Sequence, residues 1–218
     1  CKMTESLFAE NYKNTPYWWD RTPRPTIKEI PLPKETEVLV IGSGYTGLCT
    51  AIQTCRNGQD TVVLDAQDAG WGGSSRNGGQ VSPNIKPSFQ ELSRKYGEEP
   101  ARALLKEGND ALKWIGDFIQ EENIDCDFRR VGRYYGAHSL SQFKHLEKII
   151  NEQPDGLQLD VNLIPKSQQH TEIGSDFYHG GIVDQNHASL DPARFHQGLL
   201  ERALTSGAQI KTHCAVNK

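Results

Sequence analysis

The sequence lacks any apolar run near the roughly 20 residues that a membrane-spanning helix needs. We therefore predict no transmembrane helix and no membrane partner. The net charge of −4 argues against a nucleic-acid partner, because proteins that bind nucleic acids usually carry an excess of basic residues. Residues 1–25 contain no basic region followed by an apolar one, so this segment is not predicted to be a secretory signal.

Several sequence patterns of catalysis are also missing. The seven histidines show no H-E-x-x-H or clustered spacing, and the five cysteines follow no zinc or disulfide spacing, so no metal site is predicted. There is no G-x-S-x-G elbow and no P-loop, which argues against an α/β-hydrolase and a P-loop enzyme. Free cysteines are typical of a reducing compartment, and we predict a cytoplasmic protein.

Two buried strands and an intervening helix are predicted near the N-terminus. The apolar, β-branched run Val38-Leu39-Val40-Ile41 predicts a strand over 37–42. A helix is predicted over 45–57, with Gly58 as its stop, and a second buried strand over 60–66. A strand–helix–strand unit of this kind is typical of the opening of a doubly wound parallel sheet.

The turn between the first strand and the helix has the spacing G-x-G-x-x-G. Gly42 permits the tight turn, Gly44 leaves room for a pyrophosphate, and Gly47 lets the helix pack closely on the strand. Asp65 ends the second strand about 20 residues later, where a carboxylate accepts hydrogen bonds from an adenosine ribose. An acidic residue there disfavours a 2′-phosphate and therefore NADP. The alternative is a tight turn with a solvated aspartate.

The next loop bears on the choice between NAD and FAD. A short nicotinamide domain continues with another strand soon after Asp65, whereas this chain inserts GWGGSSRNGGQVSP at 70–83. Its glycines, serines, Arg76 and Asn77 suit a path along the pyrophosphate and ribityl chain toward an isoalloxazine ring. The other interpretation is a flexible glycine loop without a ligand.

The rest of the chain alternates between helical and β patterns. We predict a helix from Glu98 to about Asn123, β structure over 127–138 with a turn at Gly132, a helix over 139–151, an irregular stretch over 154–176, a candidate strand over 177–184, a helix from Asp191-Pro192 to Gly207, and a final strand over 209–216. The predicted buried stripe of the long helix is Ala101, Leu104, Leu105, Leu112, Ile115, Phe118 and Ile119.

Three segments together resemble a known family. The block from VLVIGSGYTGLCTA to GWGGSSRNGGQV is similar to the FAD-binding start of the D-amino acid oxidase-type flavoproteins. The upstream NYKNTPYWWDRTPRP and the GWGGSSRNGGQ stretch resemble the gamma-glutamylputrescine oxidoreductase-like branch. The segment SLDPARFHQGLLERALTSGAQI resembles the family's helix that re-enters the FAD domain.

The resemblance implies a non-covalent FAD and a small-molecule amine or amino-acid substrate. Its carbon–nitrogen bond is oxidised by hydride transfer to flavin N5, and the imine is then hydrolysed; a gamma-glutamylputrescine-like substrate is one candidate. By motif, the implied FAD-binding residues are Gly42, Gly44, Tyr45, Thr46, Gly47, Asp65, Ser74, Ser75, Arg76, Asn77, Gly78, Gly79 and Val216. Asp65 departs from the pattern, since many members have Glu there. No catalytic residue is predicted.

The implied fold class is α/β, a Rossmann-like FAD-binding domain with part of a mixed α+β substrate domain. We predict an N-terminal arm at 1–35, the first part of the FAD-binding domain at 36–95, a partial substrate or helical domain at 96–187, and the second part of the FAD-binding domain at 188–218. Because family members are about twice as long, we expect an N-terminal fragment whose site is completed by a missing C-terminal half or a second chain.

Two alternatives stay open at this point. An NAD-dependent dehydrogenase would need a catalytic His or a Tyr-x-x-x-Lys pattern after the cofactor domain, and the sequence shows neither. A non-catalytic dinucleotide-binding module is the second. Arg133, Tyr134 and Tyr135 on a predicted strand suit contact with a carboxylate or amine, although sheet packing explains two tyrosines equally well. Trp18 and Trp19 are interpreted as packing anchors of the arm.

Overall fold

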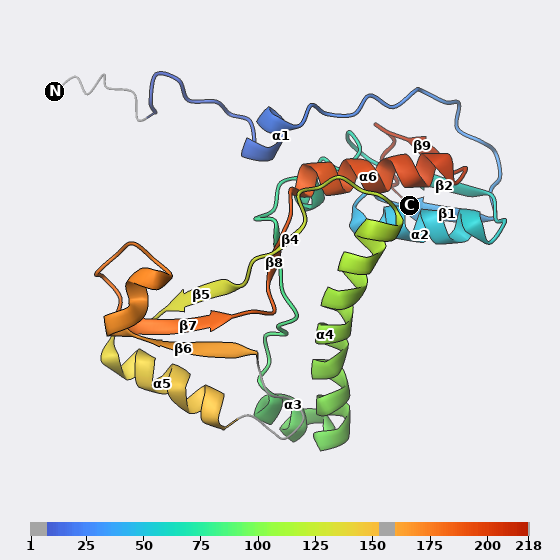
Figure 1. Ribbon diagram of the computed structural model, residues 1–218. Helices are drawn as coiled ribbons and strands as arrows, with labels where there is room; N and C mark the ends of the chain where they lie inside the picture. The colour runs from blue at the N-terminus through green and yellow to red at the C-terminus, as the bar shows by residue number, and fades with distance from the viewer. Residues whose placement is uncertain (1–7, 153–159, 218) are drawn as a thin grey trace. The chain divides into compact units, whose positions relative to one another are not determined.

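The structure is a computed structural model that describes residues 8–152 and 160–217. By compactness the chain divides into two units (Figure 1). The first is Cys1–Gly78 with Pro192–Lys218, and the second is Gly79–Asp191. In the part of the chain that is described, no helix combines the length and the apolar character needed to cross a membrane. The predicted boundaries at 35, 95 and 187 concern functional domains and stay a prediction.

The first unit combines a parallel sheet with helices. Its elements are α1 (Tyr17–Arg21), β1 (Val38–Ile41), α2 (Tyr45–Arg56), β2 (Thr61–Leu64), the 3-10 turn η1 (Gly73–Ser75), α6 (Pro192–Thr205) and β9 (Gln209–Lys211). Strand β2 lies between β1 and β9 and pairs in parallel with both. Helix α2 packs on β1 and β2, its Leu48 and Ile52 are fully buried, and α6 lies beside α2 (Figure 1).

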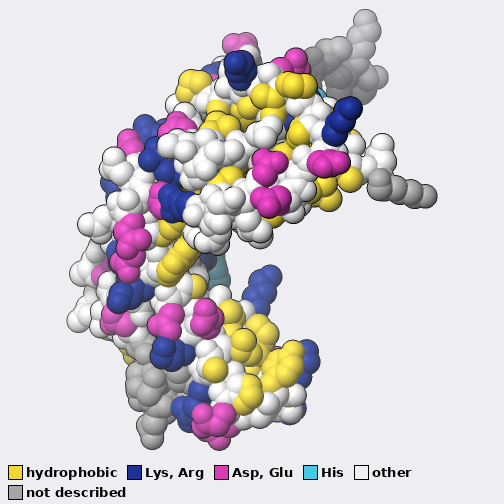
Figure 2. All heavy atoms as spheres, turned by 90° about the vertical axis from the view of Figure 1, so that its right-hand side faces the viewer, with side chains coloured by type: hydrophobic (Ala, Val, Ile, Leu, Met, Phe, Trp, Pro, Cys, Tyr) yellow, Lys and Arg dark blue, Asp and Glu magenta, His cyan; other side chains and the backbone are white. Residues whose placement is uncertain are grey.

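Strand β1 lies at an edge of this sheet. Its residues alternate in exposure: Val40 is buried, whereas Leu39 is 51% and Ile41 is 68% exposed. Figure 2 shows hydrophobic side chains at the surface of one face, among interspersed charges of both signs. Apolar side chains at a sheet edge are typical of a surface that another segment covers.

The second unit contains antiparallel strands and the longest helix. Its elements are β3 (Gln80–Val81), α3 (Phe89–Tyr96), α4 (Glu98–Glu121), β4 (Arg129–Arg130), β5 (Arg133–Gly136), α5 (Leu140–Asn151), β6 (Val161–Pro165), the 3-10 helix η2 (Lys166–Thr171), β7 (Gly180–Asp184) and β8 (Ala188–Ser189). Strand β7 lies between β5 and β6, and β8 lies between β3 and β4. Helix α5 packs along β7 (Figure 1).

Several predicted elements need correction. The stretch 154–176, predicted to be irregular, contains β6 and η2, while residues 153–159 lie outside the described residues. Strand β6 is short and half-exposed, so it has no clear alternation and owes its strand conformation to pairing with β7. The final strand ends at Lys211 rather than Val216, because its pairing with β2 ends there.

The arm and the long helix also differ from expectation. Tyr17–Arg21 is a short helix within the segment predicted to be irregular. On α4, Leu104 is 43% exposed although it belongs to the predicted buried stripe. The buried residues of α4 are Ala101, Leu112, Phe118 and Ile119. The stripe is therefore narrower than its periodicity predicts, because one face of a helix buries only the residues that meet a neighbouring element.

Candidate functional site

The first glycine turn carries α2 tightly over the end of β1. Gly42 has a φ of +93°, in the left-handed region that favours glycine. A Cβ placed on Gly47 would lie 2.0 Å from the Gly42 carbonyl oxygen, so only glycine permits this approach. The first turn of α2 contains no acidic residue, which leaves the partial positive charge of the helix N-terminus available for an anion.

Asp65 is held beside this turn by three hydrogen bonds. Its Oδ2 accepts from the Ser43 backbone N–H at 2.8 Å and from the Ser43 hydroxyl at 2.5 Å. Its Oδ1 accepts from the Gln67 N–H at 3.0 Å. Because a carboxylate has more than three acceptor positions, it retains capacity for a ribose hydroxyl. The Asp65 carbonyl also accepts from the N–H of Cys214, which brings the segment of Val216 close to it.

The second glycine loop, residues 70–83, contacts the start of α2. Ser74 Oγ accepts from the Tyr45 N–H at 3.2 Å, and Asn77 Nδ2 donates to the Tyr45 hydroxyl at 3.2 Å. A Cβ on Gly44 would lie 3.0 Å from Ser74 Oγ, so the two loops approach closely. A Cβ would meet nothing within 4 Å at Gly42, Gly72, Gly73 or Gly78. The loops therefore present bare backbone to open space, which fits a dinucleotide that needs close backbone contact.

Most of the predicted cofactor residues lie in one unit of the structure. Gly42, Gly44, Tyr45, Thr46, Gly47, Asp65, Ser74, Ser75, Arg76, Asn77 and Gly78 all lie in the first unit. Gly79 opens the second unit, and Val216 lies in the first and is 43% exposed. Their contacts with a cofactor stay a prediction.

His196 of α6 is a further residue of this site, and the sequence pattern did not single it out. Its Nε2 donates to the Ser43 carbonyl oxygen at 2.7 Å, and a Cβ on Gly70 would lie within 2.6 Å of its ring. The side chain is 1% exposed. The available signal was its place on the apolar stripe of the helix with Ala193, Leu199, Leu200 and Ala203. His196 joins α6 to both glycine loops.

We expect His196 to make stability depend on pH. Burial lowers its pKa; Arg24 acts in the same direction, whereas the bond to Ser43 and the Asp65 charge oppose it. Between the pKa of His196 in the folded chain and its pKa in the unfolded chain, the unfolded chain therefore binds more protons than the folded one. The free energy of unfolding is highest above about pH 6.5 and falls as the pH drops toward the folded pKa. Urea unfolding of wild type and His196→Gln across this range should show a shallower pH dependence in the variant. Equal slopes would contradict this role.

A second polar cluster lies within the second unit. The Tyr135 hydroxyl and Asn84 Nδ2 lie 3.0 and 3.2 Å from His187 Nε2, and Asp184 Oδ2 lies 3.4 Å from it. Burial lowers the pKa of His187. The Arg133 guanidinium lies 4.4 Å from the centre of the Tyr135 ring. Tyr135 is thus bonded within the unit, and its predicted contact with a substrate stays a prediction.

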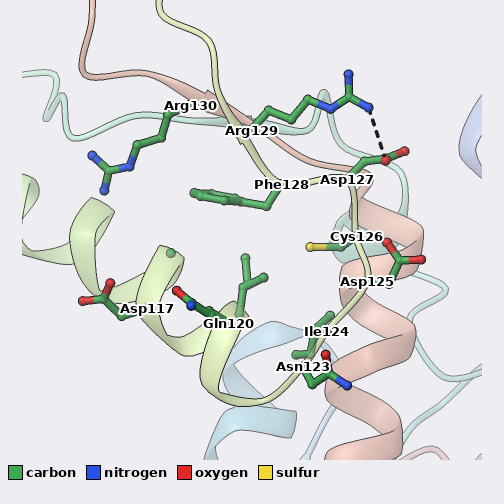
Figure 3. A pocket seen from close by; sticks show the side chains of 12 residues that line it. Asp117, Gln120, Asn123, Ile124, Asp125, Cys126, Asp127, Phe128, Arg129 and Arg130 are labelled. Carbon is green, nitrogen blue, oxygen red and sulfur yellow. Dashed lines mark ion pairs between the residues drawn. The ribbon is translucent and has the colours of Figure 1, made fainter.

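A hollow of about 740 Å³ lies elsewhere in the second unit. Figure 3 shows Asp117 and Gln120 on the helix side and Phe128 on the following segment, with Arg129 paired to Asp127 at 3.5 Å. None of the predicted cofactor residues lines it. The hollow therefore shares no lining residue with the glycine loops. Its lining carries charges of both signs, which indicate no particular ligand.

Comparison with known proteins identifies the family. The model of the family described as FAD dependent oxidoreductase matches residues 37–218. The chain belongs to this family. The predicted family, FAD as its cofactor and the FAD-binding α/β fold are thereby confirmed.

Curated relatives are similar to this chain over most of the chain's length. The chain is 29% identical to gamma-glutamylputrescine oxidoreductase of Escherichia coli, over 84% of this chain and 42% of the relative. It is 28% identical to the oxidoreductase OrdL of Haemophilus influenzae, over 81% of this chain and 41% of the relative. The chain thus spans less than half the length of these relatives.

Solved structures share the fold at low sequence identity. L-amino acid deaminase from Proteus vulgaris matches with a TM-score of 0.68 and 21% identity, over 89% of this chain and 49% of the other. Glycine oxidase from Geobacillus kaustophilus matches with a TM-score of 0.62 and 15% identity, over 82% and 46%. These likenesses concern the fold alone.

Proposed function

We propose that this FAD-dependent oxidoreductase oxidises the carbon–nitrogen bond of an amine or amino acid. The observation that carries the FAD-binding part of this proposal is the Gly42–Gly47 turn, closed by Gly47 and flanked by the fixed carboxylate of Asp65. The names of the relatives support the substrate class. A gamma-glutamylputrescine-like substrate is one candidate, because the Escherichia coli relative at 29% identity carries that name.

The residues of the first unit have separate tasks in binding. The backbone at Gly42 and Gly44 and the start of α2 would hold the pyrophosphate, while Asp65 would accept from the ribose. Residues 74–79 would hold the part of FAD between its phosphates and its ring, and the Val216 backbone would bind its adenine. When bound without a covalent link, FAD supplies a hydride acceptor for the carbon next to the amine nitrogen, and water hydrolyses the resulting imine.

We further propose that a C-terminal part, in the same or a second chain, completes the substrate site. The relatives are more than twice as long as the stretch matched here. The exposed Leu39 and Ile41 on edge strand β1 suit burial by such a part.

Among the described cysteines, Cys49, Cys55, Cys126 and Cys214 are free thiols, which supports a location in the reducing cytoplasm.

The cofactor is tested by isolating the longest natural gene product that contains this chain. We expect a yellow protein with an absorbance band at about 450 nm, since the flavin is the chromophore. Denaturation should release FAD into the filtrate, identified by chromatography against FMN and FAD standards. A colourless protein that takes up no added FAD would refute the proposed function. Reduction of the bound flavin by a panel of amines and amino acids then tests the substrate class.

A further inference from the structure

The N-terminal segment contacts the second glycine loop through a chain of hydrogen bonds. Trp19 Nε1 donates to Ser75 Oγ at 2.7 Å, and Ser75 Oγ donates to the Gly70 carbonyl oxygen at 2.6 Å. Ser75 is 1% exposed. The indole N–H of Trp19 therefore takes an acceptor position on a buried hydroxyl that itself closes the loop from Gly70 to Ser75.

Arg24 adds further hydrogen bonds to the same loop. Its Nη2 donates to the Ala69 carbonyl oxygen, and its Nη1 lies 3.2 Å from Ser75 Oγ and 3.4 Å from the Gly70 carbonyl oxygen. The guanidinium carbon lies 4.4 Å from the centre of the Trp19 ring. One planar cation thus satisfies acceptors along the loop while it stacks on the indole.

Two side chains of the loop complete this contact. The Trp71 ring lies 5.2 Å from the Trp19 ring, and the Arg76 guanidinium lies 5.3 Å from Trp19 and 5.5 Å from Trp71. Trp18 Nε1 also donates to the Asn77 carbonyl oxygen at 2.8 Å. We call Trp19, Arg24, Trp71 and Arg76 the arm–loop cluster.

A glycine-rich loop has a high conformational entropy, which binding of a cofactor would have to overcome. The arm–loop cluster removes part of that freedom before the cofactor arrives, because Trp19 and Arg24 fix Ala69, Gly70 and Ser75 at once. Binding is stronger when a loop is already ordered in its bound conformation. Trp19 and Arg24, the members of the cluster from the N-terminal segment, lie on no strand of the cofactor-binding sheet.

We propose that residues 18–24 form a strap that holds the second glycine loop in the conformation that binds FAD, with Trp19 and Arg24 as positioning residues. The proposal rests on the proposed function. Trp19 and Arg24 act through Ser75 and the loop backbone and need not touch the cofactor.

The test uses the longest natural gene product, with FAD affinity measured by quenching of flavin fluorescence in the apoprotein. Trp19→Phe keeps an aromatic ring but loses the N–H donor, and we expect a rise in the dissociation constant of roughly 10-fold. Arg24→Met should produce a similar rise. Tyr17→Phe is the matched control, because Tyr17 lies on the same helix and is 65% exposed; its affinity should equal that of wild type.

Limited trypsin digestion of the apoprotein provides a readout that needs no cofactor. Cleavage after Arg76 should accelerate at least several-fold in Trp19→Phe, while the melting temperature stays close to that of wild type. If wild type binds FAD and Trp19→Phe shows wild-type affinity and cleavage, the strap is wrong. A loss of affinity matched by a general loss of stability also refutes it. If wild type does not bind FAD, the proposed function fails, and unchanged cleavage would refute the strap separately.

Discussion

Gly47→Ala is expected to abolish FAD binding. The added methyl group would lie 2.0 Å from the Gly42 carbonyl oxygen and 3.2 Å from Val40 Cγ1, and the backbone oxygen cannot rotate away as a side chain can. Helix α2 must therefore move off the strand, which displaces its N-terminus from the phosphate position. Overpacking of a tight contact costs up to ~3 kcal/mol. Flavin content after purification and the melting temperature measure both effects.

The control for Gly47→Ala is Gly174→Ala in the second unit. A Cβ at Gly174 would meet nothing within 4 Å, so the same chemical change there should leave flavin content and melting temperature as in wild type. Normal flavin content in Gly47→Ala would mean that the close approach of helix and turn does not matter for the cofactor, and the proposed site would be wrong.

Asp65→Asn is expected to weaken FAD binding strongly without unfolding the protein. The substitution removes the charge that accepts from Ser43 and Gln67 and that we propose to accept from the ribose. Hydrogen bonds to a charged group contribute about 1.5–3 kcal/mol. The corresponding rise in the dissociation constant is roughly 10- to 100-fold, measurable by calorimetric titration of the apoprotein with FAD.

Asp60→Asn is the matched control for Asp65→Asn. Asp60 is exposed and lies just before β2, at the opposite end of the strand from Asp65. Its substitution therefore removes the same charge at a position away from the proposed ribose site. We expect its FAD affinity to equal that of wild type. Equal losses in the two variants would indicate a general effect of charge and would remove Asp65 from the site.

Some elements were missed although the sequence carried a signal for them. Helix α3 begins with a capping box, in which Ser88 and Glu91 bond each other's backbone N–H groups. That pattern is readable from the sequence as S-x-x-E. Strand β6 had no such signal, because its residues are half-exposed and only pairing with β7 makes them a strand.

The sequence by itself determined the strand, glycine turn and helix over residues 38–56, the parallel strand that ends before Asp65, and the FAD family. These features are readable because glycine spacing and apolar runs act on neighbouring residues through backbone sterics and burial. Only the tertiary structure decided that His196 bonds Ser43 and that Trp19 bonds Ser75. These contacts join residues 153 and 56 positions apart, and no local pattern specifies which distant side chains meet when helices and loops pack.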